Sequence, residues 1–509
     1  MFSITLFKKR KDIKMTTESN LGLNHSGKYP KLVKEDGQPF ISRLLPIFLW
    51  VIFAGNLGYM IVDFGSIPEW FIGKALRING FSILMWTTVS FFSAIICSYA
   101  GNYLKGFKFH ARFMVLCLSF TLSVMLLVIS NHILLIVLSW LLMGLIMSRL
   151  IGIDRSWSEA GEALKFTQKY FLTGSFFLAL GLSILAFYTG EHAMNELMLV
   201  VDELPMYVLL PSALCIIAAA IVQSAMYPFH RWLLSAMTAP TPASALMHAG
   251  FVNGAGILLA LFSSLIVASN TLTVLFVIGG FTAIIAQFTK LLQVNVKQKL
   301  ACSTIAQMGF MIMQCGLGFF NAAVVHLLLH GFYKAYLFLS SGEEIAQTKP
   351  YKPVQLDITP LQALAVLLFG GLGAYFFVFL TGKNMMLNSS VFLTLIVAIT
   401  IGQATYNIVK ERSLSMMHKI LVPTLLFVTG IGTYALLYSG VTTLMSDFPM
   451  AEQPIPLTWV QLIFGVIFLI GFFVMKLGVY KKIPWLYVKL MNISQPNKKT
   501  ILMYQSKSI

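Results

Sequence analysis

The sequence predicts an all-α membrane protein, a bundle of about fourteen helices that cross the bilayer. Of its 509 residues, 57% are hydrophobic and only 11% are charged, whereas a soluble globular domain carries about 25% charged residues. Apolar stretches long enough to cross the hydrocarbon core as helices recur between short polar segments. The chain is therefore predicted to contain no soluble domain.

Each apolar stretch is predicted to form one span. The predicted spans are residues 44–64, 79–100, 112–129, 132–152, 169–188, 206–228, 240–267, 272–291, 301–319, 321–340, 359–380, 389–409, 416–438 and 458–478. They define a transmembrane region at residues 44–478, between basic tails at residues 1–43 and 479–509. The polar stretches at residues 157–169 and 341–358 are predicted to be loops. Translation could begin at Met1 or Met15.

The distribution of charge predicts the orientation. The net charge is +17, and lysine and arginine cluster at residues 8–11, 105–112, 290–299, 410–419 and 481–482. Residues 191–203 and 447–452, between these clusters, are rich in acids. Because cytoplasmic loops of membrane proteins accumulate lysine and arginine, we expect both termini in the cytoplasm and the protein in the plasma membrane. The same rule explains the positive charge without nucleic-acid binding.

Cysteine usage gives no metal site. The five cysteines lie in or at the ends of apolar stretches, and none has the spacing of a zinc site or of a disulfide framework. No glycine-rich dinucleotide motif follows a predicted strand. We therefore expect no cofactor in this chain and a transport role rather than catalysis, and any linked metal chemistry must reside on another chain.

One apolar stretch is predicted to be an interrupted helix. Pro240 and Pro242 stand at its start, His248 lies inside it, and Asn253 and Gly254 follow. A broken backbone within lipid must be shielded by protein or line a cavity, and interrupted helices with ionisable residues near mid-membrane are typical of ion-coupled transporters. The alternative is that His248 is a hydrogen-bonded core residue without a role in transport.

A second group of ionisable residues lies in the predicted span at 321–340. His326, His330 and Lys334 are spaced by four residues, which places them along one side of a helix at steps of about 6 Å. Such a row favours an ion or proton path. In the alternative, the histidines bond to neighbouring helices and Lys334 extends to the interface.

Two further lysines are less distinctive. By composition alone, Lys297 is a loop cation, and Lys383 is an interface anchor near a possible second interruption at residues 381–384. None of the predicted spans contains an interior Asp or Glu. Any ion path must therefore use histidine, lysine and neutral polar groups.

These motifs carry a family resemblance. Residues 240–249 resemble the PTPVSALIHA signature of the antiporter-like subunits of respiratory complex I and Mrp-type antiporters, and the resemblance continues over about residues 110–410. It implies two inverted five-helix repeats, each with a discontinuous helix. It also implies that the following residues occupy the ion-path positions of the family: His248, Lys297, His326, His330, Lys334 and Lys383.

The chain departs from this family at one charged couple. Where the family has a glutamate after a tryptophan, Leu141 follows Trp140, and Gln223 replaces a lysine. Losing both partners of a buried ion pair together is tolerable, whereas losing one is not. The resemblance therefore implies that Gln223 is a neutral polar residue at an ion-path position. It also implies that the titratable path lies mainly in the second repeat.

The sequence around His230 and His248 is similar to a stand-alone branch, the DabB-type membrane subunits of inorganic carbon accumulation complexes. This implies a large cytoplasmic zinc-binding partner similar to β-carbonic anhydrases. The first hypothesis is thus a CO2 or bicarbonate uptake subunit that conducts protons or sodium ions. The alternatives are a proton-translocating subunit of a complex I or Mrp-type assembly, and a non-conducting scaffold for a cytoplasmic partner.

Overall fold

The structure is a computed structural model that describes residues 39–341, 360–382, 388–395, 416–448, 450–476 and 479–501. Nine helical stretches within these ranges are long and apolar enough to cross a membrane. The prediction of an all-α membrane bundle is confirmed. The predicted span at residues 389–409 lies largely outside the described residues, as does the predicted loop at 341–358.

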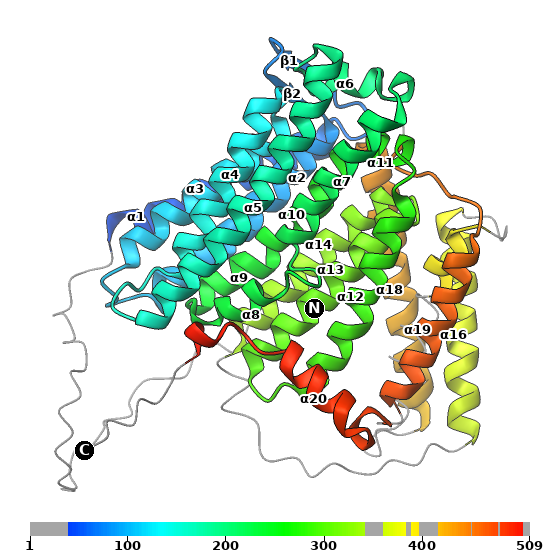
Figure 1. Ribbon diagram of the computed structural model, residues 1–509. Helices are drawn as coiled ribbons and strands as arrows, with labels where there is room; N and C mark the ends of the chain where they lie inside the picture. Colours follow the sequence, from blue (N-terminus) through cyan, green and yellow to red (C-terminus); the bar gives the residue numbers. More distant parts are fainter. Residues whose placement is uncertain are drawn as a thin grey trace, which may run out of the picture. The chain divides into compact units, whose positions relative to one another are not determined.

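The long helices lie side by side in the bundle (Figure 1). In the first part of the chain they are α1 (Phe40–Val62), α2 (Gly80–Tyr103), α3 (His110–Ile129), α4 (Ile133–Ile151), α5 (Ser158–Thr189) and α7 (Met206–Gln223). In the second part they are α12 (Leu272–Leu292), α13 (Val296–Gly316), α14 (Phe320–Leu339), α16 (Pro360–Thr381), α18 (Met416–Leu444) and α19 (Trp459–Lys476). Short helices α6 (Met194–Leu199) and α8 (Arg231–Ser235) lie in the connections.

A small hairpin at one end of the bundle was not expected from the sequence. Strands β1 (Trp70–Ile72) and β2 (Leu76–Ile78) pair antiparallel between α1 and α2. The backbone amides of Asn131 and His132 donate to the Ala75 carbonyl, which ties the hairpin to the connection between α3 and α4. Strands of three residues are too short to produce a recognisable alternation of polar and apolar side chains.

The predicted loop at residues 157–169 is wrong. These residues form the first turns of α5, which begins at Ser158 and continues for 32 residues. Glu159 in its first turn complements the helix dipole, and Lys165 pairs with Glu162 at 3.0 Å. Polarity in this stretch marks where the helix leaves the membrane, not where the helix ends.

The region predicted to be a C-terminal tail folds back onto the bundle. Helix α20 (Pro484–Ile493) lies at the opposite end of the bundle from β1 and β2, next to α12 (Figure 1). Leu490 packs with Leu292 and Tyr480 in a small separate core. The Ile493 carbonyl accepts a hydrogen bond from His230 Nε2 at 2.8 Å, and Asn497 N donates to Ser235 Oγ at 2.9 Å.

Acid is expected to loosen this C-terminal segment. Burial lowers the pKa of His230 to about 4 and outweighs the opposing effect of its hydrogen bond to the Ile493 carbonyl. An unfolded histidine titrates near about 6.5. The stabilisation of the docked segment by neutral His230 is therefore complete above that pH and is lost as the pH falls toward about 4. Hydrogen exchange of residues 484–500 should therefore slow less between pH 7 and 5 than base catalysis alone predicts. In His230→Gln, which cannot titrate, the slowing should match that expected from base catalysis.

Close packing of two helices positions the residues described below. Helices α12 and α13 meet at Gly279 and Gly309. A Cβ atom on Gly279 would lie 2.5 Å from Met313 N, and one on Gly309 would lie 2.6 Å from Ala283 N. Small residues allow such backbone approach in membrane helices, where packing rather than the hydrophobic effect drives association.

Candidate ion pathway

The interrupted helix lies inside the bundle as three pieces. They are α9 (Thr241–Ala249), the 3-10 turn η3 (Phe251–Asn253) and α10 (Gly254–Leu261). Pro240 precedes α9 and Pro242 lies in its first turn, where a missing backbone N–H does no harm. The prolines thus begin the helix, and the interruption itself falls at residues 250–253, directly after His248.

The backbone carbonyls freed by this interruption have side-chain partners. Asn253 Nδ2 donates to Ala249 O at 2.7 Å, and Ser224 Oγ donates to Val252 O at 2.6 Å. Gln223 Nε2 donates to Phe251 O at 3.3 Å. These bonds explain how the break is tolerated at membrane depth. They also show what the neutral residue at position 223 does: it supports the broken backbone.

Removing one of these donors should destabilise the protein. In Ser224→Ala the buried Val252 carbonyl loses its side-chain donor, and we expect the free energy of unfolding to fall by about 1–3 kcal/mol. Thermal unfolding in detergent would measure this. Ser212→Ala is the matched control on the same helix, since Ser212 is also buried but donates only to Val208 O of α7 itself. Equal shifts for the two variants would contradict this account of the break.

Lys334 and His248 are connected through one carbonyl and one hydroxyl. Lys334 is completely buried, and its Nζ donates to Leu300 O at 3.3 Å. The Thr304 hydroxyl donates to the same carbonyl at 3.1 Å. His248 Nδ1 lies 3.0 Å from Thr304 Oγ1. The result is a continuous polar connection from α14 through α13 to the interrupted helix.

This connection determines which ring nitrogen of His248 carries the proton. Because the Thr304 hydroxyl hydrogen is directed to Leu300 O, Thr304 Oγ1 accepts from His248 Nδ1–H. The Nε2 lone pair of His248 is then free, and this buried atom has no hydrogen-bond partner among the described residues. The ring also stacks on Phe338 at 4.2 Å. His248 is therefore held in one orientation as a proton acceptor.

His330 is held in the same way at the other side of the break. Its Nδ1 lies 3.2 Å from Asn253 Oδ1, while the amide nitrogen of Asn253 donates to backbone carbonyls. His330 Nδ1 must therefore be the donor, and its buried Nε2 is unpaired within the described part of the chain. The ring of His326 follows at 6.2 Å between centroids. We refer to His248, His326, His330 and Lys334 as the histidine–lysine cluster.

The structure describes one of the two further lysines predicted to lie on the ion path, Lys297, but not the other, Lys383. Lys297, which composition alone placed in a loop, lies in the first turn of α13, and its Nζ donates to Ala239 O at 2.9 Å. It thereby contacts the entrance of the interrupted helix. Lys383 lies outside the described residues, as does the rest of the possible second interruption beyond Gly382. Thr304 was not expected from the sequence to be a functional residue. Its bond to the carbonyl four residues earlier is one that a threonine in any helix can make.

No acidic side chain pairs with the histidine–lysine cluster among the residues that the structure describes. The ion pairs found among the described residues join Lys74 to Glu196, Arg77 to Glu69 and Lys165 to Glu162, all away from the cluster. The described residues also include no group of three side chains able to hold a metal ion. A buried ammonium that donates to one carbonyl and is linked through Thr304 to the proton-accepting imidazole of His248 can take part in proton exchange.

Comparison with known proteins identifies the family. Residues 130–401, more than half of the chain, match the model of the transmembrane part of NADH:quinone oxidoreductase and Mrp antiporter subunits. The chain belongs to this antiporter-like family. The match includes the interrupted helix and the whole histidine–lysine cluster, so both features lie within the family's defining region.

Relatives within the family come from two kinds of assembly. A probable inorganic carbon transporter subunit DabB of Bacillus subtilis is 33% identical over 309 residues, which are 60% of this chain and 58% of that protein. NADH-quinone oxidoreductase subunit L of Escherichia coli is 33% identical over 321 residues, which are 61% of this chain and 52% of that protein. The chain thus matches little more than half the length of these relatives.

A solved structure agrees in fold over most of the chain. The Mrp complex from Dietzia sp. DQ12-45-1b includes a chain that superposes with a TM-score of 0.62 at 19% identity. The superposition covers 90% of this chain and 56% of that chain. An archaeal membrane-bound sulfane sulfur reductase complex matches with a TM-score of 0.55 at 18% identity, over 91% of this chain and 94% of the other. The antiporter-like architecture therefore extends beyond the region of sequence similarity.

Proposed function

We propose that the protein is the membrane subunit of a two-component inorganic carbon uptake system in the plasma membrane, with both termini in the cytoplasm. In this proposal, protons or sodium ions move down their gradient through the histidine–lysine cluster. Their movement energises CO2 or bicarbonate conversion by a large cytoplasmic zinc-binding partner of carbonic-anhydrase type. The similarity to DabB subunits supports this choice, as do Leu141 and Gln223 in place of the charged couple of the respiratory relatives.

The observation that carries the proposal is the environment of Lys334. A completely buried ammonium at membrane depth carries a large free-energy penalty and is retained where it serves an ion path. Carbonyl and hydroxyl oxygens connect it to His248, and His330 lies one helical turn away on α14. Neutral packing would need none of these groups.

The path begins at Lys297. Its ammonium contacts Ala239 O at the start of α9, at the end of the bundle predicted to face the cytoplasm. From there the charge passes to His248 and Lys334, then along α14 to His330 and His326. At His248 and His330 a proton binds the free Nε2 and is released from the same nitrogen to the next group, while Thr304 and Asn253 hold the Nδ1 proton in place. Lys383 would extend the path outward, and Gln223 supports the break without titrating.

Growth and assembly test this proposal together. Expressed with its zinc-binding partner in a host that lacks carbonic anhydrase, the wild-type chain should restore growth in ambient air. The two proteins should also purify as one complex. Recovery of the chain with redox subunits or Mrp subunits would instead favour the second candidate, a proton-translocating subunit of a respiratory or Mrp-type assembly. The similarity to subunit L of Escherichia coli supports that candidate.

Reconstitution distinguishes conduction from a scaffold role. In vesicles with an internal pH-sensitive dye, the chain and its partner should dissipate an imposed pH gradient or sodium gradient. Vesicles that remain tight although the complex is assembled would leave only the scaffold function. A scaffold gains no stability from a buried ammonium that has no ion-pair partner among the described residues, so we expect measurable flux.

A further inference from the structure

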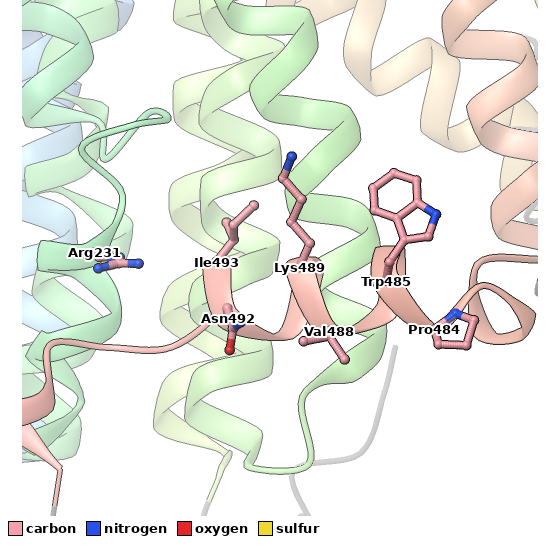
Figure 2. Close-up of a pocket in the computed structure, with 7 residues that line it drawn as sticks. All are labelled: Arg231, Pro484, Trp485, Val488, Lys489, Asn492 and Ile493. Atoms are coloured by element: carbon pink, nitrogen blue, oxygen red, sulfur yellow. The ribbon is translucent and has the colours of Figure 1, made fainter.

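A groove lies between helix α20 and the start of α8, outside the ion pathway. Its volume is about 580 Å³. The residues that line it are Arg231, Pro484, Trp485, Val488, Lys489, Asn492 and Ile493 (Figure 2). Trp485 and Lys489 point to the same side of α20, and Arg231 lies beyond the C-terminal end of this helix. The groove therefore combines two cations with apolar walls.

The two walls of the groove are fixed to each other. His230, next to Arg231, donates to the carbonyl of Ile493, which itself lines the groove. On the far side of α20, Leu490 is buried against Leu292 and Tyr480. The groove is consequently preorganised, and binding of a ligand would lose little free energy to ordering of its walls.

The two cations of this groove have no ion-pair partner within the described part of the chain. Neither Arg231 nor Lys489 takes part in the ion pairs found among the described residues, and no acidic side chain lines the groove. Both side chains are exposed. In the full sequence no acidic residue follows Glu452. The groove thus favours an anion, and a guanidinium with an ammonium suits a phosphate group.

The position of α20 brings the groove to the membrane surface. Helix α19 ends at Lys476 and α20 begins at Pro484, so α20 must lie at the membrane boundary. Trp485 is 66% exposed and Val488 is 54% exposed on this helix. Exposed tryptophan beside lysine is typical of the lipid headgroup layer. An acidic protein surface would match the cations but would leave these two apolar side chains without a partner.

We propose that this groove binds the headgroup of an anionic phospholipid. Arg231 and Lys489 hold its phosphate, and its acyl chains lie along Trp485 and Val488. Basic residues next to a membrane span attract anionic lipids by about 1 kcal/mol each. The lipid joins α20 to the segment that leads through α8 into the interrupted helix, and so stabilises that end of the bundle independently of any transported ion.

Lipid-dependent stability of the full-length protein in neutral detergent tests this site. Dioleoylphosphatidylglycerol should raise the thermal midpoint, and dioleoylphosphatidylcholine or inorganic phosphate at equal concentration should not. Arg231→Gln combined with Lys489→Gln should weaken phosphatidylglycerol binding by about 30-fold, because two cation contacts are lost. Native mass spectrometry gives the binding directly. Trp485→Ala, at an exposed position, should weaken it without disturbing the core.

The matched control removes the same charge nearby. Lys498→Gln with Lys499→Gln changes two exposed lysines of the same segment that do not line the groove, and lipid binding should stay within about twofold of wild type. Equal losses in both double variants would overturn the proposal in favour of nonspecific attraction. A wild-type response in the groove variant, or an equal response to inorganic phosphate or soluble polyglutamate, would also overturn it. None of these measurements depends on transport activity, so they test the lipid site separately from the proposed function.

Discussion

Lys334→Met is expected to abolish ion conduction without unfolding the protein. Methionine fills a similar volume and removes a completely buried ammonium whose described hydrogen bond is to one carbonyl. Because a buried charge without a counterion destabilises the fold, the thermal midpoint should stay the same or rise. Flux in reconstituted vesicles should fall at least about 100-fold, the scale of a lost proton-transfer group. Growth in ambient air should be lost with it.

Lys299→Met provides the control for this prediction. Lys299 is exposed near the start of α13, close in sequence to Lys297 but outside the histidine–lysine cluster. Its variant should conduct and support growth like wild type. Wild-type flux through the Lys334→Met protein would refute the proposed path, whereas loss of stability in that variant would refute our account of an uncompensated charge.

Gly309→Ala is expected to have the largest effect on stability. The added Cβ would lie 2.6 Å from Ala283 N and 2.7 Å from Gly279 O. Both atoms belong to the backbone of α12, so the clash cannot be relieved by a rotamer change, and the helices must separate. We expect the free energy of unfolding to fall by about 3 kcal/mol or more, with most of the protein lost during purification.

Gly161→Ala makes the same chemical change with the opposite expected sign. Gly161 lies in α5, and a Cβ there meets no atom within 4 Å. Alanine should therefore stabilise α5 by about 0.5–1 kcal/mol through helix propensity. Thermal unfolding of both variants in one detergent gives the comparison. If Gly309→Ala unfolds at the wild-type temperature, the close approach of α12 and α13 is not required.

The Gly309 contact also links stability to the candidate site. Helix α13 contributes the Leu300 carbonyl and Thr304, which connect Lys334 to His248. A shift of α13 away from α12 would therefore change the geometry of the pathway. A Gly309→Ala protein recovered at low temperature should conduct less than wild type, although none of its ionisable groups has changed.

The sequence by itself determined the membrane class and the approximate positions of most helices. Hydropathy over about 20 residues is a local property, so predicted spans such as 79–100 and 272–291 agree with α2 and α12 to within a few residues. The spacing of His326, His330 and Lys334 on one helix was equally local. A polar stretch can be a loop or the part of a helix that extends beyond the bilayer. For residues 157–169 the loop prediction was wrong because the helix continues out of the membrane.

Tertiary structure alone decided how these groups act. The partners of Lys334, His248 and His330 come from other helices, at sequence separations of 34, 56 and 77 residues. No local pattern specifies such contacts, since they depend on how α12, α13 and α14 pack. The same holds for α20, whose basic sequence resembles a loose tail. It is a docked helix only because His230 and Leu292 meet Ile493 and Leu490 across the folded chain.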